Sequence, residues 1–280
     1  MRFSVRTAVP LVMAALCACG GAAVPSAAPI ASPSASPSAA VITPDQKLRM
    51  ERLSSVFENG TIAFAYGYAE NIGDGRGITC GRVGFTTGTG DWYQVVKAYT
   101  ALEPANPLAA YLSRLAQIAS GPQPNPDTTG LDGMIAATAA AGTDPVMQSV
   151  QDQFVDTLIY NPALQIAGQV GATSALSVAD IYDGVLTNGQ GSDPDSIEAI
   201  VSAATIAAHG TPKSGVRESD WLSAFDAARR NDMLHPAYSA TSAAWAAAVG
   251  RLDVYDKLIA TGNWNLQGPI DTLTYGVTVP

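Results

Sequence analysis

The sequence predicts an α+β protein that is mainly α-helical and has one small β-sheet. Apolar residues recur at helical spacing in most segments after residue 43. Only residues 71–90 combine glycine and threonine with short apolar runs, a pattern typical of hairpin strands. The chain has 280 residues, of which 47% are hydrophobic, so it can bury a core of ordinary size.

We expect the first 19 residues to be an export signal. Arg2 and Arg6 form a basic start, and residues 7–19 are apolar but too few for a permanent membrane-spanning helix. The mature protein is therefore expected outside the cytoplasm, either secreted or lipid-anchored at a bacterial cell envelope.

The end of this leader predicts a lipid anchor. Residues 16–20 (LCACG) resemble a bacterial lipobox, in which Cys19 would carry the lipid. Cys17 is atypical inside such a motif, so ordinary cleavage near Ala22 or Ala23 is the alternative. Contact with a membrane is expected only through this anchor.

Residues 20–42 are almost wholly Ala, Pro, Ser and Gly and predict a disordered tether, because they offer too few large apolar side chains to repay ordering. The folded domain is expected to span residues 43–280. Its first helix starts with Thr43 as N-cap and Pro44 at the first helical position. The helix should end near residues 58–60, where Asn and Gly are stop signals.

The predicted β region at residues 71–90 comes next, with glycine-rich turns between its strands. After residue 91 the helical spacing returns. The predicted helices are 92–102, 108–118, 147–158, 172–186, 197–209, 221–233 and 242–260. Residues 120–129, with three prolines, and residues 188–194 are predicted loops.

The charge balance bears on the partner. With 24 acidic and 15 basic residues the formal net charge is -9, which argues against a nucleic-acid partner and favours a cationic ligand. An acidic surface that merely keeps the protein soluble is an equally good explanation at this point.

Several kinds of catalytic site find little support. Cys80 is the only thiol outside the leader region and reads as a small buried residue. The two histidines, His209 and His235, form no HExxH motif, which disfavours a zinc hydrolase and a Ser-His-Asp hydrolase. The glycines of residues 73–77 fit neither a dinucleotide fingerprint nor a calcium loop. These motifs therefore give no positive indication of a metal or dinucleotide site.

What remains is a pair of carboxyl groups in different surroundings. Glu58 ends an amphipathic helix beside apolar neighbours, whereas Asp74 lies in a polar glycine-rich turn near Arg76. Such surroundings push the two pKa values apart, so Glu58 could donate a proton while Asp74 stays ionised and activates water. Taken alone, the pair could equally be a helix-end side chain and a turn former.

Four runs of residues favour the interpretation of Glu58 and Asp74 as a catalytic pair. They are 54–59 (SSVFEN), 66–79 (YGYAENIGDGRGIT), 84–91 (GFTTGTGD) and 99–108 (YTALEPANPL). In this order they resemble the signature of the family 46 chitosanases. Weaker similarity continues through residues 182–183, 225–234 and 251–266, so the resemblance covers nearly all of the mature chain.

The resemblance implies a lysozyme-like, two-lobed fold and an inverting glycoside hydrolase that needs no metal and no organic cofactor. Glu58 matches the family's catalytic acid and Asp74 its base, and Thr79 would help to hold the attacking water. In the family an arginine and aspartate network tunes the acid. The matching positions here are Arg251, Asp183 and Arg229, although a helical arginine is also often a surface residue.

The resemblance also suggests substrate contacts. Asp91 matches a residue that grips a glucosamine ammonium group, although it could equally cap the helix that opens at Trp92. Arg76, Tyr68 and Thr89 fall on cleft positions, and for Tyr68 core packing is the alternative. The segment between Glu58 and Asp74 is shorter than in well-known members, which bears on subsite preference more than on reaction type.

The predicted function is endo-acting, inverting hydrolysis of β-1,4 linkages in chitosan, by a protein expected to be a monomer. One alternative keeps the lysozyme-like fold but assigns an N-acetylated glycan as substrate. The other is a lipoprotein that binds a cationic glycan without cleaving it.

Overall fold

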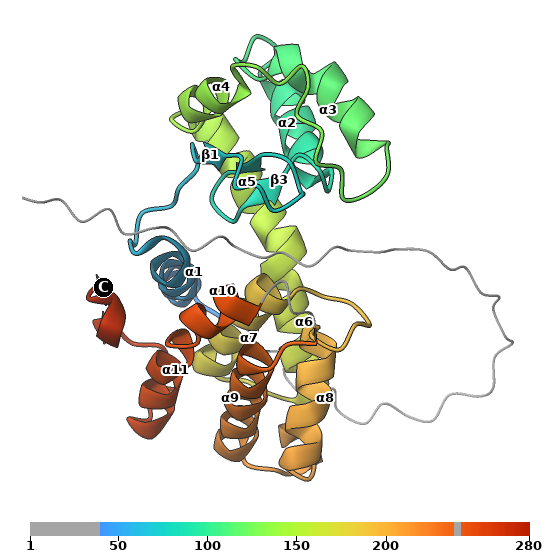
Figure 1. Ribbon diagram of the computed structural model, residues 1–280. Coiled ribbons are helices and arrows are strands. Elements are labelled where there is room, and N and C mark those ends of the chain that lie inside the picture. Colours follow the sequence, from blue (N-terminus) through green and yellow to red (C-terminus); the bar gives the residue numbers. More distant parts are fainter. Residues whose placement is uncertain (1–39, 238–241) are drawn as a thin grey trace, which may run out of the picture.

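The computed structural model describes residues 40–237 and 242–280, which form two lobes (Figure 1). Cys19, the leader and most of the predicted tether lie outside the described residues. The larger lobe contains α1 (Pro44–Asn59), α6 (Asn161–Val170), α7 (Ala175–Asn188), α8 (Ile197–Ala207), η3 (Pro212–Ser214), α9 (Glu218–Leu234), α10 (Ser242–Ala248), α11 (Arg251–Ala260) and η4 (Leu273–Tyr275). The smaller lobe contains α2 (Asp91–Leu102), η1 (Ala109–Tyr111), α3 (Leu112–Ala119) and α4 (Met134–Ala141) beside a small sheet.

One long helical segment connects the lobes. The helix α5 (Pro145–Val155) starts in the smaller lobe, continues through the π-helical turn η2 (Asp156–Tyr160), and enters the larger lobe as α6 (Figure 1). Asp144 caps α5 by accepting a hydrogen bond from the Val146 backbone N–H. The predicted mainly α, two-lobed architecture is therefore confirmed.

The helix α1 begins and ends as its sequence predicts. Thr43 forms a capping box with Gln46, Pro44 occupies the first turn, and Gly60 ends the helix with a left-handed φ of 68°. Met50, Leu53 and Val56 are fully buried on one face. Because this face anchors the helix in the core, Glu58 at its last turn is held in a fixed position at the junction of the lobes.

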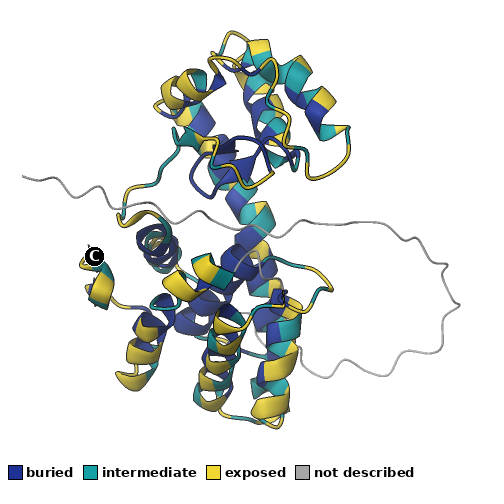
Figure 2. Cartoon of the chain, in the orientation of Figure 1, coloured by how far each residue is buried: buried dark blue, intermediate teal, exposed yellow. Residues whose placement is uncertain are grey.

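The helix α7 is the centre of the larger lobe. Every residue of α7 is buried, and the helix packs against α1, α6, α9 and α11 (Figure 2). Two of its buried residues, Asp180 and Asp183, are carboxylic acids with no exposed side-chain surface. Buried carboxylates need paired cations, so their presence predicts arginines on the neighbouring helices.

The small sheet lies in the predicted β region. It consists of β1 (Ala69–Glu70), β2 (Thr79–Cys80) and β3 (Phe85–Thr86), paired antiparallel in that order. Ala69 faces Cys80, and Cys80 faces Phe85. Cys80 is fully buried, as predicted.

Glycines shape the turn between β1 and β2. Gly73, Gly75 and Gly77 all have positive φ, which other residues rarely adopt. A Cβ atom on Gly77 would lie 2.2 Å from the Thr87 Oγ1 atom, so close packing also requires glycine there. This turn carries Asp74.

The structure contains elements that the sequence analysis did not anticipate. The helices α4 and α6 were not predicted, and the predicted helix 242–260 is divided into α10 and α11. The single predicted β region is joined by a second, two-stranded sheet of β4 (Ile270–Asp271) and β5 (Thr278–Val279). Within residues 40–237 and 242–280, no helix is both long and apolar enough to cross a membrane.

Candidate active site

The first catalytic candidate, Glu58, lies at the C-terminal turn of α1 with a side chain that is only 13% exposed. Its neighbour Phe57 packs against Tyr255 and Tyr275, with ring centroids 5.8 and 5.1 Å away. Burial raises the pKa of Glu58, Arg251 opposes this rise, and the negative charge of Asp183 adds to it. A carboxyl group in this setting retains its proton to higher pH than a free glutamic acid.

A chain of ion pairs runs from Glu58 into the larger lobe. The Arg251 Nη2 atom lies 2.6 Å from Glu58 Oε1, and Arg251 Nη1 lies 3.2 Å from Asp183 Oδ1. The other oxygen of Asp183 lies 2.8 Å from Arg229 Nη2. Although burial disfavours ionisation of Asp183, Arg251 and Arg229 outweigh it and lower the pKa of Asp183. The structure thus brings together the residues named for the acid-tuning network.

All three network residues are buried, so the alternative of surface arginines is wrong. Arg229 is 0% and Arg251 2% exposed. Additional hydrogen bonds hold the chain: Ser54 Oγ donates to Asp183 Oδ1, and Arg251 Nη1 donates to Thr187 Oγ1. Because α1, α7, α9 and α11 each contribute one member, packing of the larger lobe fixes the surroundings of Glu58.

The second candidate, Asp74, is held by its own turn. Its Oδ1 accepts a hydrogen bond from the Arg76 backbone N–H at 3.0 Å, and its Oδ2 lies 2.8 Å from Arg76 Nε and 2.6 Å from Arg76 Nη2. The Asp74 side chain is 25% exposed and that of Arg76 10%. This is the polar, glycine-rich setting that the sequence predicted, and it leaves part of the carboxyl group in contact with solvent.

Thr79 lies on β2 and is 3% exposed. Its Oγ1 atom is buried and makes no hydrogen bond to any residue of the described ranges. This hydroxyl therefore has both donor and acceptor capacity for a water molecule.

Asp91 and Thr89 form a compact hydrogen-bonded turn. Asp91 Oδ1 accepts from the Thr86 backbone N–H at 2.7 Å, from Thr89 Oγ1 at 2.9 Å, and from the Trp92 backbone N–H at 2.7 Å. Burial raises the pKa of Asp91 to about 6, against the lowering effect of these hydrogen bonds. The N-cap of α2 is Gly90, so the expectation that Asp91 caps this helix is wrong. Its role as an ammonium contact stays a prediction.

Tyr68 is half-buried rather than a core residue, and its hydroxyl donates to Glu70 Oε2 at 3.0 Å. Burial and the neighbouring Glu70 raise the pKa of Tyr68 to about 12. The phenol is therefore neutral at physiological pH and can donate or accept hydrogen bonds at the edge of the sheet.

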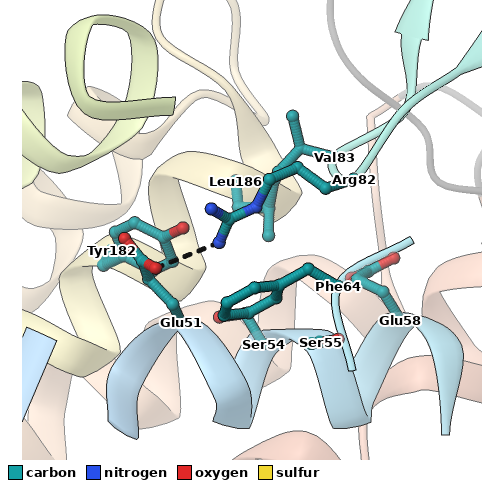
Figure 3. Close-up of a pocket in the computed structure, with 9 residues that line it drawn as sticks. All are labelled: Glu51, Ser54, Ser55, Glu58, Phe64, Arg82, Val83, Tyr182 and Leu186. Carbon is teal, nitrogen blue, oxygen red and sulfur yellow. Dashed lines mark hydrogen bonds and ion pairs between the residues drawn. The ribbon is translucent and has the colours of Figure 1, made fainter. Parts of the chain in front are cut away.

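A small pocket beside Glu58 is lined by residues of both lobes (Figure 3). Its lining consists of Glu51, Ser54, Ser55, Glu58, Phe64, Arg82, Val83, Tyr182 and Leu186. Asp74 is not among these residues.

Arg82 is the residue in this pocket that the sequence analysis missed. It lies in the turn between β2 and β3, and its Nη2 atom lies 3.0 Å from Glu51 Oε2 of α1 (Figure 3). Its Nη1 pairs with Asp152 of α5, and its guanidinium carbon lies 3.8 Å from the centroid of the Phe64 ring. Arg82 thus connects the smaller lobe to the helix that carries Glu58. An arginine in a turn between strands gives no sequence signal of such a role.

No group of three or more His, Cys, Asp or Glu side chains in the described part of the chain has the arrangement of a metal site.

Comparison with known proteins identifies the family. Residues 52–270 match the family described as glycosyl hydrolase family 46. The chain belongs to glycosyl hydrolase family 46. The predicted family is thereby confirmed.

Family 46 relatives match along most of their length. A chitosanase of Bacillus subtilis (strain 168) is 41% identical over 231 residues, which cover 82% of this chain and 83% of the relative. The solved complex of a Gynuella sunshinyii family 46 chitosanase with chitotetraose has a TM-score of 0.79 and 37% identity, covering 86% of this chain and 99% of that one. A native chitosanase from Bacillus subtilis MY002 also has a TM-score of 0.79, with 39% identity and coverage of 86% and 100%.

Proposed function

We propose that the protein is a chitosanase, which cleaves internal β-1,4 linkages of chitosan with inversion at the anomeric carbon. Membership of family 46 supports this activity, as do the relatives named chitosanase and the neighbour solved with chitotetraose. At the site itself the proposal depends on Glu58, a carboxyl group whose burial raises its pKa at the junction of the two lobes.

In the proposed reaction Glu58 donates its proton to the oxygen of the scissile linkage as that bond breaks. A water molecule attacks the anomeric carbon from the opposite face of the sugar ring, and Asp74 accepts a proton from this water. Inversion requires room for the water, so the two carboxyl groups should stand roughly 6.5–9.5 Å apart in the substrate complex. After the reaction Glu58 regains a proton and Asp74 loses one, which restores the enzyme.

The remaining predicted residues have supporting roles in this proposal. Thr79 contributes its free hydroxyl to the attacking water, because no described residue occupies that hydrogen bond. Asp91 supplies a carboxylate for a glucosamine ammonium group, and Arg76 fixes Asp74. In this proposal Tyr68 and Thr89 contact the sugar chain. An acidic protein of net charge -9 suits a cationic polymer.

Incubation with soluble, deacetylated chitosan tests the activity. We expect new reducing ends, a rapid fall in polymer length typical of internal cleavage, and α-anomeric products in early proton NMR spectra. Initial β-anomers would contradict inversion. A folded protein that binds chitosan without shortening it would be a glycan-binding lipoprotein, and faster cleavage of chitin or peptidoglycan would assign an N-acetylated substrate.

We further propose that the protein acts outside the cytoplasm, attached through Cys19 or released after cleavage of the leader. The support is the basic and apolar leader with its lipobox-like residues 16–20. Metabolic labelling with palmitate tests the anchor: label in the wild type that is lost in Cys19→Ser supports it, and an unlabelled protein in the medium supports ordinary cleavage.

A further inference from the structure

The ion-pair chain behind Glu58 continues beyond the residues considered so far. Arg229 Nη1 lies 2.5 Å from Asp180 Oδ1, and the carboxyl groups of Asp180 and Asp226 of α9 lie close enough to shift each other's pKa. Asp180 is 0% and Asp226 1% exposed. If both were ionised, Asp180 Oδ2 and both oxygens of Asp226 would be buried without a hydrogen-bond donor. One proton shared by the two carboxyl groups pairs Asp180 Oδ2 with one of the Asp226 oxygens and avoids placing two negative charges side by side.

The charge balance of the chain supports the same conclusion. Two guanidinium groups, Arg251 and Arg229, face four carboxyl groups, those of Glu58, Asp183, Asp180 and Asp226. With Glu58 protonated as the catalytic acid, three carboxyl groups remain against two cations. A proton on the Asp180 and Asp226 pair makes the buried chain neutral, whereas an extra charge there would be costly.

We propose that Asp226 is a positioning residue that stays protonated in the active enzyme and donates a hydrogen bond to Asp180. Asp180 then remains a full counterion for Arg229, which leaves Arg229 and Arg251 in place around Asp183 and so maintains the setting of Glu58. This role rests on the proposed function, since it assigns Asp226 to the support of the acid.

The groups around Asp226 determine its titration. Burial raises the pKa of Asp226 well above its usual range, and the charge of Asp180 adds to this rise while Arg229 opposes it. From α11, Asp256 raises it further, and the Tyr255 phenol of the same helix donates to the Ala179 carbonyl. The helix α10 carries no titratable residue, and Glu198, the only one of α8, accepts from the Gly191 backbone N–H.

The variant Asp226→Asn tests the proposal, because its amide N–H can replace the carboxyl O–H as donor to Asp180. In the wild type the folded state holds a proton that the unfolded chain releases above about pH 4, so rising pH favours unfolding until the folded pair itself titrates. We expect Asp226→Asn not to show this loss of stability at higher pH. Its Tm relative to the wild type should increase as the pH is raised from about 4 to 8.

Activity profiles on chitosan separate a positioning role from a purely structural one. For Asp226→Asn we expect the alkaline limb of the kcat profile to stay at the wild-type pH. The double variant Asp180→Asn with Asp226→Asn is the matched control. It removes the one negative charge of the pair, so the pKa of Glu58 should fall and the limb should move to lower pH. If Asp226→Asn alone moved the limb as far as this double variant, or changed Tm equally at every pH, Asp226 would be ionised and the proposal wrong. A pH-dependent gain in Tm without any chitosan hydrolysis by the wild type would instead overturn the proposed function alone.

Discussion

Glu58→Gln is expected to lower kcat on chitosan by about a hundredfold or more, because a positioned general acid typically contributes this much and an amide is too weak an acid to transfer a proton to the leaving oxygen. The glutamine carbonyl can still accept the hydrogen bond from Arg251 Nη2, so Tm should change little. Initial rates of reducing-end release, measured over a range of chitosan concentrations, separate kcat from KM. We expect the change in KM to be small.

Glu103→Gln is the matched control for this prediction. Glu103 is exposed at the end of α2, and the substitution makes the same chemical change away from the pocket. It should leave kcat at the wild-type value. Near-normal turnover of Glu58→Gln would contradict the assignment of the acid.

Because the pKa of Glu58 is raised and the acid must be protonated, wild-type kcat should fall as the pH rises through that pKa.

Asp74→Asn is expected to reduce kcat by a similar factor, about a hundredfold or more, because an amide cannot accept the proton of the attacking water. The asparagine Oδ1 can still accept from the Arg76 backbone N–H, which preserves the turn. Added formate should restore part of the activity of Asp74→Ala, where a small carboxylate can occupy the freed space, and should not restore that of Glu58→Gln. Rescue is measured as reducing-end release with increasing formate.

Asp132→Asn serves as the control for Asp74→Asn, since Asp132 is exposed and lies outside the site in the smaller lobe. Its turnover should match the wild type. If Asp74→Asn kept most of its activity, or if formate activated both catalytic variants equally, Asp74 would not be the base.

The sequence predicted those elements whose signals are local. The helix α1 was recognisable from Thr43, Pro44 and Gly60, and the sheet from its glycine-rich turns. The helix α4 was not recognisable, because its sequence MIAATAAA does not divide into an apolar face and a polar face. The helix α6 was not predicted because it contains Pro162, and a proline usually indicates a break in a helix. Proline is tolerated in the first turn of a helix, and Pro162 stands in the first turn of α6. The strands β4 and β5 are too short to display an alternating pattern.

The site was predictable only in part, because only some of its contacts are between residues that are close in the sequence. The setting of Asp74 is local, so its turn and Arg76 could be read from neighbouring residues. The partners of Glu58 lie up to 193 positions away in the chain, and only the family resemblance placed Arg251 beside it. Asp226 stands three positions before Arg229 and looks like an ordinary helix-surface ion pair, so nothing in the sequence indicated its burial.

The contact of Arg82 with Glu51 has a consequence for how the enzyme behaves in salt. Dissolved ions weaken attractions between exposed charges, such as those that draw a cationic polymer towards an acidic surface. Arg82 is 3% and Glu51 9% exposed, so counterions scarcely reach the bond that joins the two lobes. Ionic strength therefore acts mainly on the encounter with the polymer and has little effect on the buried contact between Arg82 and Glu51.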